Sequence, residues 1–389
     1  MPWKETSPVE ERMRFVTRLR EGERLVDLCL EYGISRKTGA KIKKRYSEEG
    51  VKGLEDRSRA PSQIPHQTPP EIRALIVAAK KKHMTWGPKK VRAWLADKHP
   101  GLCFPSPVTC GNWLERAGLV KKRGSRRRAS ATLKPSELTE PKAPNDVWAV
   151  DFKGQFRLGN GSYCYPLTIT DQFSRLLVGV VALDSTKMAP ARAAFEDVFR
   201  EFGLPRVIRS DNGTPFASTG LAGLTVLSTY WLRLGIRPER IEPGHPEQNG
   251  QHERMHRTLK EDTTRPAGRT MLQQQERFDA FREEFNNERP HEAIGQRPPA
   301  KLYLPSKRAY PSVLPPVEYP LHDVSRGVSF GGCFSMSGAL CFLSHALTHE
   351  RVGLREIDDG RWLVSFMHVD LGHYDERTNR FEPSSEVTL

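Results

Sequence analysis

The first 120 residues carry apolar side chains at the spacing of α-helices. Apolar positions three and four residues apart predict helices over Glu10–Arg20 and over Arg24–Tyr32. A Gly-Ile-Ser turn follows, and its Ser35 is placed to cap a third helix that begins at Arg36 and ends near Gly50. Two helices joined by a short turn that contains glycine form the layout of a helix-turn-helix.

A second helical unit is predicted after a linker-like stretch. Helical spacing continues from Pro70 to Leu119, and within it Val108–Ala117 has the pattern of a further recognition helix. Residues 121–144 are rich in lysine, arginine and proline, so we expect a basic linker there.

From Asp146 the pattern changes to strands that alternate with helices. Val147–Lys153 alternates as a strand does, and a Gly-Asn-Gly turn signal at 159–161 separates it from two more predicted strands, Tyr163–Thr170 and Leu176–Leu183. Helices are then predicted over 190–202, 221–234, 249–261 and 271–288, and strands over 206–209 and 236–241. Three antiparallel strands followed by helices and two more strands predict an α/β domain of the ribonuclease H type.

The expected fold class is therefore multidomain, with an all-α N-terminal region, a central α/β domain and a small C-terminal β domain. Short strands with glycine turns from about Val324 onward predict the last of these. The expected boundaries are 1–60 for a helix-turn-helix domain, 61–120 for a second helical DNA-binding unit, 121–144 for the basic linker, 145–305 for the ribonuclease H-like core and 321–389 for a small β-barrel-like domain.

The net charge of +14 is unevenly distributed along the chain. Residues 1–140 carry 31 Lys and Arg against 16 Asp and Glu, whereas residues 309–389 carry 6 against 11. A basic region joined to near-neutral ones indicates a polyanionic partner, which we expect to be double-stranded DNA. No apolar run approaches the ~18 residues that a membrane helix needs, so an intracellular protein without a membrane partner is expected.

Basic side chains of the third predicted helix and of the arm after it are candidates for contacting DNA. They are Arg36, Lys37, Lys41, Lys44 and Arg45 in the helix, and Arg57 and Arg59 in the arm. The second helix of a helix-turn-helix lies in the major groove, and arginine-bearing arms often reach a minor groove. A solvated face of a helical hairpin would carry similar charge, but the position of the basic helix directly after the turn favours DNA binding.

Three acidic residues fall where a metal-dependent phosphoryl-transfer site could form. Asp151 lies within the first predicted strand, Asp211 directly follows the fourth, and Glu253 lies near the start of a helix. Phosphoryl transfer needs hard cations held by oxygen ligands from converging elements. Taken singly, an Asp before Asn-Gly is usually a turn residue, and a Glu in a first helical turn usually complements the helix dipole. Asp171, equally polar in context, is interpreted as a structural turn residue.

Residues 148–300 resemble the catalytic domain of bacterial insertion-sequence transposases of the Asp-Asp-Glu type, which are similar to retroviral integrases. The matching segments are Val147-Trp-Ala-Val-Asp, Ser210-Asp-Asn-Gly, His245-Pro-Glu-Gln-Asn-Gly-Gln-His-Glu-Arg and Phe285-Asn-Asn-Glu-Arg-Pro-His. Further segments, Tyr32-Gly-Ile-Ser-Arg-Lys-Thr-Gly and Gly53-Leu-Glu-Asp-Arg-Ser-Arg-Ala-Pro, resemble the helix-turn-helix of that family and the arm after it. The resemblance covers most of the chain and is weakest beyond about residue 320.

The resemblance implies an integrase-type core in which Asp151, Asp211 and Glu253 bind Mg²⁺ or Mn²⁺, two ions to a site. It implies a transposase that binds the terminal inverted repeats of an insertion sequence, cleaves the DNA ends and joins them to target DNA. A homo-oligomer, at least a dimer on DNA, would do this in the bacterial cytoplasm, at the nucleoid when bound. Asp211 and Glu253 are separated by 41 residues, more than is common in the family, which fits a longer loop around Gly220.

Glu253 has companions that suit a DNA end. Arg257 and Lys260 are four and seven residues further along the chain, hence on the same helical face, and could hold phosphates beside the metals. Two other nearby acidic residues, Glu239 and Glu242, flank a predicted strand and are expected to face solvent.

Two other functions remain open from the sequence. The chain could be a catalytically inactive, sequence-specific DNA-binding protein on the same scaffold, although all three acidic residues are present. It could also be a ribonuclease H-like nuclease that only hydrolyses, but such an enzyme does not need the long basic N-terminal third.

Overall fold

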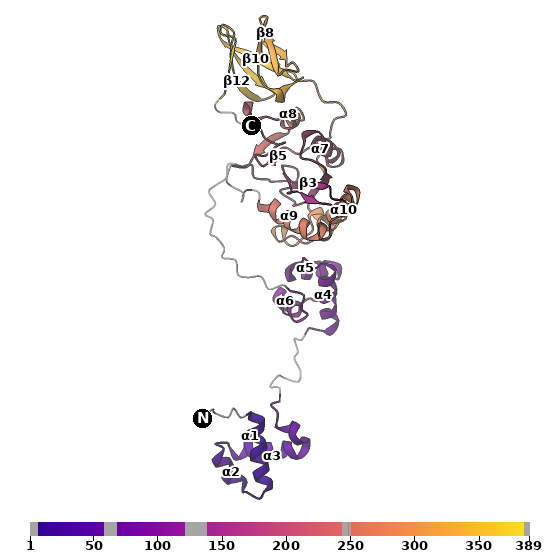
Figure 1. The fold of residues 1–389 in the computed structure, drawn as a ribbon, viewed down its shortest axis with the longest axis vertical. Coiled ribbons are helices and arrows are strands. Elements are labelled where there is room, and N and C mark those ends of the chain that lie inside the picture. Colours follow the sequence, from indigo (N-terminus) through magenta and orange to yellow (C-terminus); the bar gives the residue numbers. More distant parts are fainter. Residues whose placement is uncertain (1–6, 58–67, 121–137, 243–247, 249, 385–389) are drawn as a thin grey trace. The chain divides into compact units, whose positions relative to one another are not determined.

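The computed structural model describes residues 7–57, 68–120, 138–242, 248 and 250–384 (Figure 1). By its internal contacts the chain divides into two compact units, Met1–Gln67 and Thr68–Leu389. The finer domain boundaries expected from the sequence stay predictions.

The first unit contains the three helices that the apolar spacing predicts. They are α1 (Pro8–Arg20), α2 (Leu25–Glu31) and α3 (Arg36–Glu49), and a 3-10 turn, η1 (Gly50–Leu54), follows. The Ser35 hydroxyl accepts a hydrogen bond from the Thr38 N–H at 3.1 Å, so the predicted N-cap is confirmed. A Cβ on Gly39 would lie 2.5 Å from Cys29 Sγ. Glycine therefore lets α3 approach α2 closely around the core of Phe15 and Leu28.

The second unit begins with another group of three helices. They are α4 (Pro70–Lys82), α5 (Pro88–Lys98) and α6 (Pro107–Arg116), and α6 confirms the helix predicted at 108–117. They bury a shared apolar core that includes Ile76, Trp86, Val91, Leu95 and Leu114. Each helix has a proline in its first turn, where the missing N–H has no intrahelical acceptor in any case.

The central domain is built on one mixed sheet. Its strands are β1 (Val147–Phe152), β2 (Phe156–Arg157), β3 (Tyr163–Asp171), β4 (Leu177–Leu183), β5 (Val207–Ser210) and β6 (Arg237–Arg240). β3 pairs antiparallel with β1, β2 and β4, whereas β5 pairs parallel with β1 and β6. The predicted antiparallel strands followed by two more strands are thus confirmed, and the sheet orders them β4-β3-β1-β5-β6.

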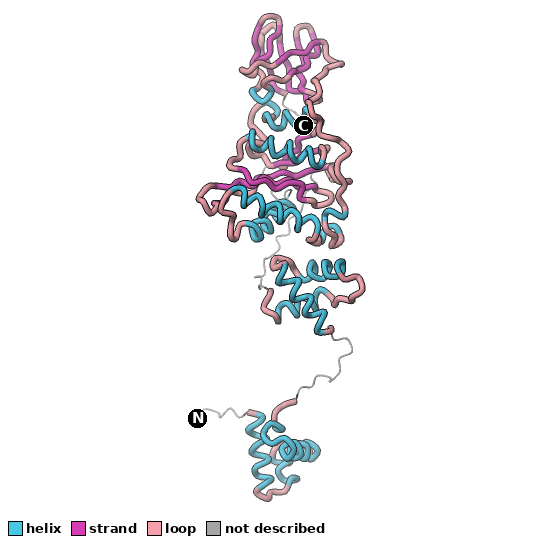
Figure 2. The backbone as a smooth tube through the Cα atoms, turned by 90° about the vertical axis from the view of Figure 1, so that its right-hand side faces the viewer, coloured by secondary structure: helices cyan, strands magenta, loops and turns pink. Residues whose placement is uncertain are grey.

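Helices cover both faces of this sheet, as Figures 1 and 2 show. The helices of the two layers are α7 (Met188–Phe202), α8 (Val226–Arg233), α9 (Gly250–Thr263) and α10 (Met271–Asn287). The apolar core on the α7 and α8 side includes Trp148, Val150, Phe195, Phe199 and Trp231. The core on the α9 and α10 side includes Leu177, Val180, Met255, Leu259 and Phe278.

One predicted helix begins later than expected. The apolar run from Leu221 predicts a helix to Leu234, but α8 starts only at Val226. Thr225 and Ser228 form a reciprocal capping box there, with the Ser228 N–H donating to Thr225 Oγ1 at 3.1 Å. Before it, Leu221–Gly223 forms a separate 3-10 turn (η2) with Ala222 at φ 54°, a conformation that a helix cannot contain.

The C-terminal β domain consists of a five-stranded antiparallel sheet and a hairpin. The strands are β7 (Val324–Gly327), β8 (Cys333–Met336), β9 (Ala339–Phe342), β10 (Arg351–Asp358), β11 (Arg361–Phe366), β12 (Val369–Asp375) and β13 (Arg380–Pro383). The sheet order is β13-β12-β11-β10-β7, and the β8–β9 hairpin contacts both of its outer strands. Short 3-10 turns at Glu292–Ile294, Pro299–Lys301 and His345–Leu347 complete the second unit.

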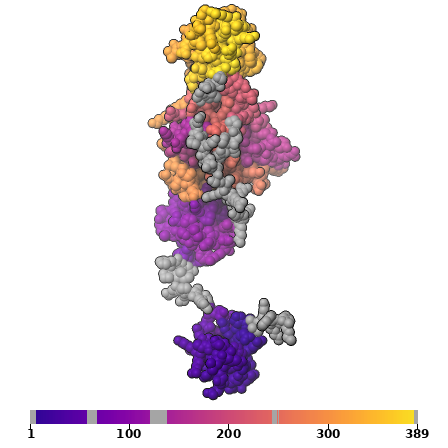
Figure 3. Space-filling view, turned by 90° about the vertical axis from the view of Figure 1, so that its left-hand side faces the viewer, coloured from indigo at the N-terminus to yellow at the C-terminus, as the bar shows by residue number. Residues whose placement is uncertain are grey.

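The core of the C-terminal sheet continues into the central domain. Leu224 and Leu232 pack into the same apolar cluster as Phe334, Val352 and Phe366. In Figure 3 the yellow C-terminal residues lie directly against the red residues of the central domain. Within the described residues, no helix is long and apolar enough to cross a membrane.

Candidate active site

The three predicted carboxylates come from neighbouring elements of the central domain. Asp151 lies in β1, opposite Thr168 of β3, and Asp211 directly follows β5, the parallel neighbour of β1. Glu253 lies in the first turn of α9. Each residue therefore occupies the element and position that the sequence predicts.

These carboxylates act on one another electrostatically. Burial raises the pKa of Asp151 to about 7, and the charge of Asp211 raises it next, with a further contribution from Glu253. A carboxyl group between like charges in a partly dry site favours its protonated form. The Asp211 side chain also accepts the Gly213 N–H at 3.1 Å, which fixes the turn after β5.

The donor set suits a divalent cation in kind and in charge. Carboxylate oxygens are the ligands that Mg²⁺ and Mn²⁺ prefer, and a cation would relieve the repulsion concentrated at Asp151. Over the part of the chain that the structure describes, however, no three His, Cys, Asp or Glu side chains are grouped closely enough to hold a metal ion. Asp151, Asp211 and Glu253 would hold such an ion by their chemistry, although the structure does not group them at ligand distance.

Helix α9 separates an exposed charged face from a buried one. Glu253, Arg257 and Lys260 are exposed, as their predicted common face requires. The opposite face buries His252, Met255, His256, Leu259 and Thr263.

Lys153 is a basic residue of this site that the sequence argument missed. Burial lowers its pKa, the charge of Lys260 lowers it further, and the charge of Asp151 raises it. Lys153 therefore lies close enough to Lys260 and Asp151 to act on both. Its position two residues after Asp151 was the available signal, because alternate residues of a strand face the same side.

Two buried histidines of α9 were also missed. His252 is fully buried and His256 is 8% exposed, and burial lowers the pKa of His252 to about 4 and that of His256 to about 2. Both rings are therefore neutral. His256 Nδ1 lies 3.8 Å from Asp151 Oδ2. Their spacing of four residues beside Glu253 was visible in the sequence and places both on one helical face.

Glu239 does not face solvent, so that expectation is wrong. Its side chain is 10% exposed and pairs with Arg209 Nε at 2.6 Å. It also accepts the backbone N–H and the hydroxyl of Thr139, at 2.9 and 2.6 Å. Glu239 therefore ties the segment before β1 to β5 and β6, a long-range contact that local sequence does not reveal. Glu242 is exposed, as expected.

Asp171 is a structural residue, as interpreted from the sequence. Its fully buried carboxylate accepts the Asn145 N–H at 2.8 Å, and the N–H and hydroxyl of Ser174 at 2.7 and 2.6 Å. Asn145 in turn accepts hydrogen bonds from Trp148 Nε1 and the Tyr303 hydroxyl. Asp171 thus fixes the start of β1 and the turn after β3.

The predicted DNA contacts of the first unit lie mostly on an open surface. Arg36, Lys37, Lys41 and Lys44 are exposed along α3, and Arg45 is half-buried. Arg57 is exposed but forms an ion pair with Glu49 at the end of α3. Arg59 lies outside the described residues.

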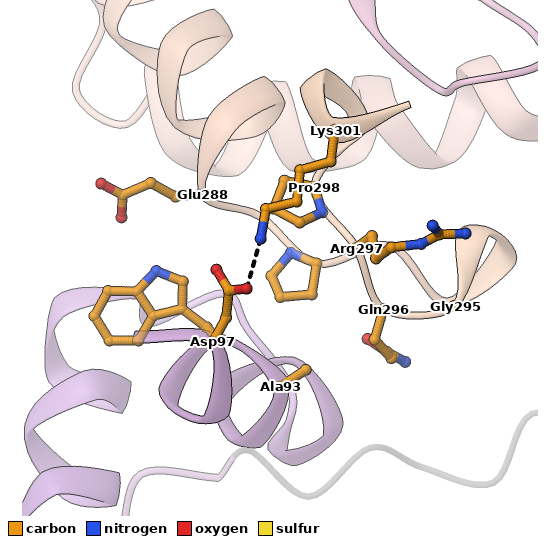
Figure 4. A pocket seen from close by; sticks show the side chains of 10 residues that line it. Ala93, Asp97, Glu288, Gly295, Gln296, Arg297, Pro298 and Lys301 are labelled. Carbon is orange, nitrogen blue, oxygen red and sulfur yellow. Dashed lines mark hydrogen bonds and ion pairs between the residues drawn. The ribbon is translucent and has the colours of Figure 1, made fainter. Parts of the chain in front are cut away.

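A shallow pocket lies apart from these carboxylates, between α5 and residues 288–301 (Figure 4). Trp94, Asp97, Arg297 and Lys301 are among its lining residues, and Lys301 Nζ pairs with Asp97 Oδ1 at 2.5 Å. Neither Asp151, Asp211 nor Glu253 lines it. It lies where the helices of residues 70–116 meet the central domain.

Family models match four segments of the chain. Two integrase core domain models match residues 141–246 and 234–299. A helix-turn-helix domain model matches residues 11–62, and a homeodomain-like domain model matches residues 38–114.

Proteins of insertion elements and retroviral polyproteins are similar in sequence. A 31.7 kDa protein of insertion element IS407 from Burkholderia multivorans is 28% identical over 48% of this chain and 65% of its own length. A 39.2 kDa protein of insertion element IS476 from Xanthomonas euvesicatoria is 26% identical over 61% of this chain and 66% of its own length. The Gag-Pol polyprotein of baboon endogenous virus is 34% identical over 35% of this chain but only 8% of its own length.

Solved structures of viral integrases align at low identity. The HTLV-2 integrase catalytic core domain in complex with magnesium is 15% identical, with a TM-score of 0.34, and covers 42% of this chain and 100% of its own. A chain of the simian T-cell lymphotropic virus intasome is 16% identical, with a TM-score of 0.37. The alignment covers 80% of this chain and 97% of that one. By the family models, the chain carries an integrase core domain within residues 141–299 and helix-turn-helix domains N-terminal to it. The IS407 and IS476 insertion-element proteins are its homologues.

Proposed function

We propose that this protein is a transposase that binds the terminal inverted repeats of an insertion sequence, cleaves the DNA ends and joins them to target DNA. The observation that carries the proposal is that Asp151, Asp211 and Glu253 lie on neighbouring elements of the integrase core, near enough for their charges to interact. Asp211 and Glu253 both raise the pKa of Asp151, although they come from distant parts of the sequence.

The carboxylates would hold Mg²⁺ or Mn²⁺, as the pair of ions that phosphoryl-transfer sites commonly use. When bound, the metal supplies activation of the attacking oxygen and stabilisation of the leaving oxygen. Asp151 and Asp211 are held by the sheet, which limits their movement, and Glu253 is carried by α9. The protein would thus contribute to catalysis by positioning the carboxylate oxygens that bind the metal.

The basic residues around the carboxylates would bind the DNA end. Arg257 and Lys260 are exposed on the Glu253 face of α9, and Lys153 lies near Lys260 and Asp151. Lysine and arginine hold phosphates by charge-assisted hydrogen bonds. These three residues would therefore orient the scissile phosphate and exclude alternative positions of the strand.

Recognition of the repeats would fall to the N-terminal helices. The exposed basic face of α3, with Arg36, Lys37 and Lys41, suits the major groove and its flanking phosphates. The second group of helices, α4 to α6, is a further candidate for reading the repeats, since a homeodomain-like model that matches residues 38–114 includes most of it. Arg57 would have to leave Glu49 before it could reach a minor groove.

A joining assay with pre-cut element ends tests the proposal. We expect strand transfer into target DNA that requires Mg²⁺ or Mn²⁺, stops with excess chelator and is lost in Asp151→Asn. Calcium is expected to support end binding without joining, because its looser coordination suits the chemistry poorly.

The same assay separates the other functions. End binding without joining or cleavage by the wild-type protein would indicate an inactive DNA-binding protein. Cleavage without joining would indicate a nuclease. Undiminished joining in excess chelator would rule out the metal-dependent mechanism.

A further inference from the structure

A buried polar cluster joins α9 to the strand opposite Asp151. Thr168 of β3 stands at its centre, and its Oγ1 lies 2.8 Å from His252 Nε2 and 2.7 Å from His256 Nε2. The same hydroxyl donates to the backbone carbonyl of Asp151 at 3.0 Å. Thr170 extends the cluster, with its Oγ1 3.2 Å from His252 Nδ1. We call Thr168, His252 and His256 the threonine–histidine cluster.

Counting protons fixes the direction of each hydrogen bond. A hydroxyl has one proton and two lone pairs. Thr168 gives its proton to the Asp151 carbonyl, so both histidines must donate to it through Nε2–H. Each neutral ring then carries its proton on Nε2 and has an acceptor at Nδ1. Nδ1 of His252 then accepts from the Thr170 hydroxyl. Nδ1 of His256 faces the Asp151 carboxyl group at 3.8 Å.

The cluster is unusual for this contact between helix and sheet. Apart from Thr263, the rest of the buried face of α9 uses the apolar side chains Met255 and Leu259, which share an apolar cluster with Leu177 and Val180. Apolar packing alone fixes the rotation of a helix only coarsely, because dispersion is not directional. Three hydrogen bonds that converge on one hydroxyl oxygen do give such a preference, since their angles are restricted.

The cluster flanks the third carboxylate. His252 immediately precedes Glu253 and His256 follows it by three residues, so the two rings hold the helical turn that carries Glu253. Through Thr168, that turn is tied to the backbone of Asp151 in β1.

From this geometry we propose that Thr168, His252 and His256 are positioning residues that set the rotation of α9 so that Glu253 faces Asp151 and a divalent cation. The proposal rests on the metal-dependent function proposed above. A positioning residue of this kind acts through the carboxylates, and loss of such a partner typically lowers metal affinity about 10- to 100-fold.

Thr168→Val tests the proposal, because it removes the hydroxyl with little change in volume. Thr168→Ser keeps the hydroxyl and serves as the conservative variant. Thr263→Val is the matched control, since Thr263 is also buried on α9 but its hydroxyl donates only within the helix, to the Leu259 carbonyl at 2.7 Å.

Mn²⁺ binding to the full-length chain, measured by electron paramagnetic resonance, gives a readout that is independent of DNA joining. We expect Thr168→Val to weaken Mn²⁺ binding about tenfold or more, while Thr168→Ser and Thr263→Val bind it as the wild type does. Melting temperature and circular dichroism establish that each variant is folded. If Thr168→Val does not fold, His256→Leu provides the same comparison, because it removes one donor and keeps an apolar volume.

The proposal is overturned if folded Thr168→Val, or His256→Leu in its place, binds Mn²⁺ as the wild type does. It is also overturned if Thr263→Val weakens binding equally, because the effect would then reflect general loosening of α9. A wild-type protein that binds Mn²⁺ but joins no DNA ends would contradict the transposase proposal alone, and the variants would still decide the role of the cluster.

Discussion

Burial and two neighbouring carboxylates, Asp211 and Glu253, all raise the pKa of Asp151. A carboxyl whose pKa rises on folding binds its proton more tightly in the folded chain than in the unfolded one. Protonation of Asp151 therefore stabilises the metal-free fold, and this contribution is lost as the pH rises from the ordinary aspartate range through about 7. Above pH 7 the ionised Asp151 lowers the stability of the fold, and a bound cation would offset this loss because it is attracted to the carboxylate.

Asp151→Asn should remove that loss of stability. We expect the melting temperature of the metal-free variant, relative to the wild type, to increase by a few degrees between about pH 5.5 and pH 8.5. Differential scanning calorimetry in the presence of chelator measures this, with the exposed Asp184→Asn as control. A difference between Asp151→Asn and the wild type that does not change with pH would contradict the electrostatic account.

Glu253→Gln tests the third carboxylate. Removing one charged metal ligand while keeping the side-chain shape should lower DNA cleavage and joining by orders of magnitude, with end binding and fold retained. Glu261→Gln, two turns further along α9 and also exposed, should retain joining close to the wild-type rate. The placement of Glu253 in the site is wrong if its variant joins DNA normally.

At the scale of elements, local signals predict most of what the structure contains. Caps, turn glycines and apolar periodicity place α1 to α3 and the strands of the central sheet other than β2 within a few residues, because these signals act between near neighbours. The helix predicted from Leu221 starts late because the Thr225 capping box competes with an apolar run, and apolar residues alone do not mark a helix start.

The contribution of the basic face of α3 to DNA binding can be measured from the salt dependence of the affinity. Each phosphate contact contributes about 0.9 to the slope of log affinity against log salt concentration. Lys37→Ala with Lys41→Ala should therefore weaken binding to end DNA and reduce the slope by about 1.8. Arg14→Ala with Arg20→Ala removes the same charge from the exposed side of α1 and should have a smaller effect. Fluorescence anisotropy across a salt series compares them, and equal slopes for the two double variants would count against α3 as the DNA-binding helix.

At the scale of the whole molecule, the contacts that organise the site join segments that are distant in the sequence. Sequence patterns, which report near neighbours, do not predict such contacts. Glu239 pairs with Arg209 and Thr139, and Thr168 meets two histidines more than eighty residues away. The sequence shows these residues but not their partners, since the fold brings the partners together. The three carboxylates could be named from the family's motifs, whereas the residues that support them could not.

One such contact is the ion pair between Arg233 of α8 and Glu350, which directly precedes β10 of the C-terminal sheet. Its contribution to the free energy of unfolding can be measured. Arg233 Nη1 lies 2.8 Å from Glu350 Oε2, with side chains 15% and 17% exposed. Glu350→Gln leaves a mostly buried guanidinium without its charge partner, and we expect a loss of about 1–3 kcal/mol. The exposed Arg361–Glu382 pair is the control, and Glu382→Gln should cost less than about 1 kcal/mol. Urea denaturation measures both, and equal costs would show that burial does not matter here.

The last prediction concerns how many copies of the chain act together. Joining both ends of an element to a target needs two 3′-hydroxyl nucleophiles, each at its own active site, and one chain carries one set of Asp151, Asp211 and Glu253. We therefore expect at least two subunits on a pair of ends, measured by light scattering of the protein–DNA complex after size-exclusion chromatography. Mixing wild-type subunits with Glu253→Gln subunits adds a kinetic test. If both ends must be joined by active subunits of one assembly, the yield of doubly joined product falls more steeply than the wild-type fraction. One subunit per pair of ends, together with a yield proportional to the wild-type fraction, would contradict assembly on DNA.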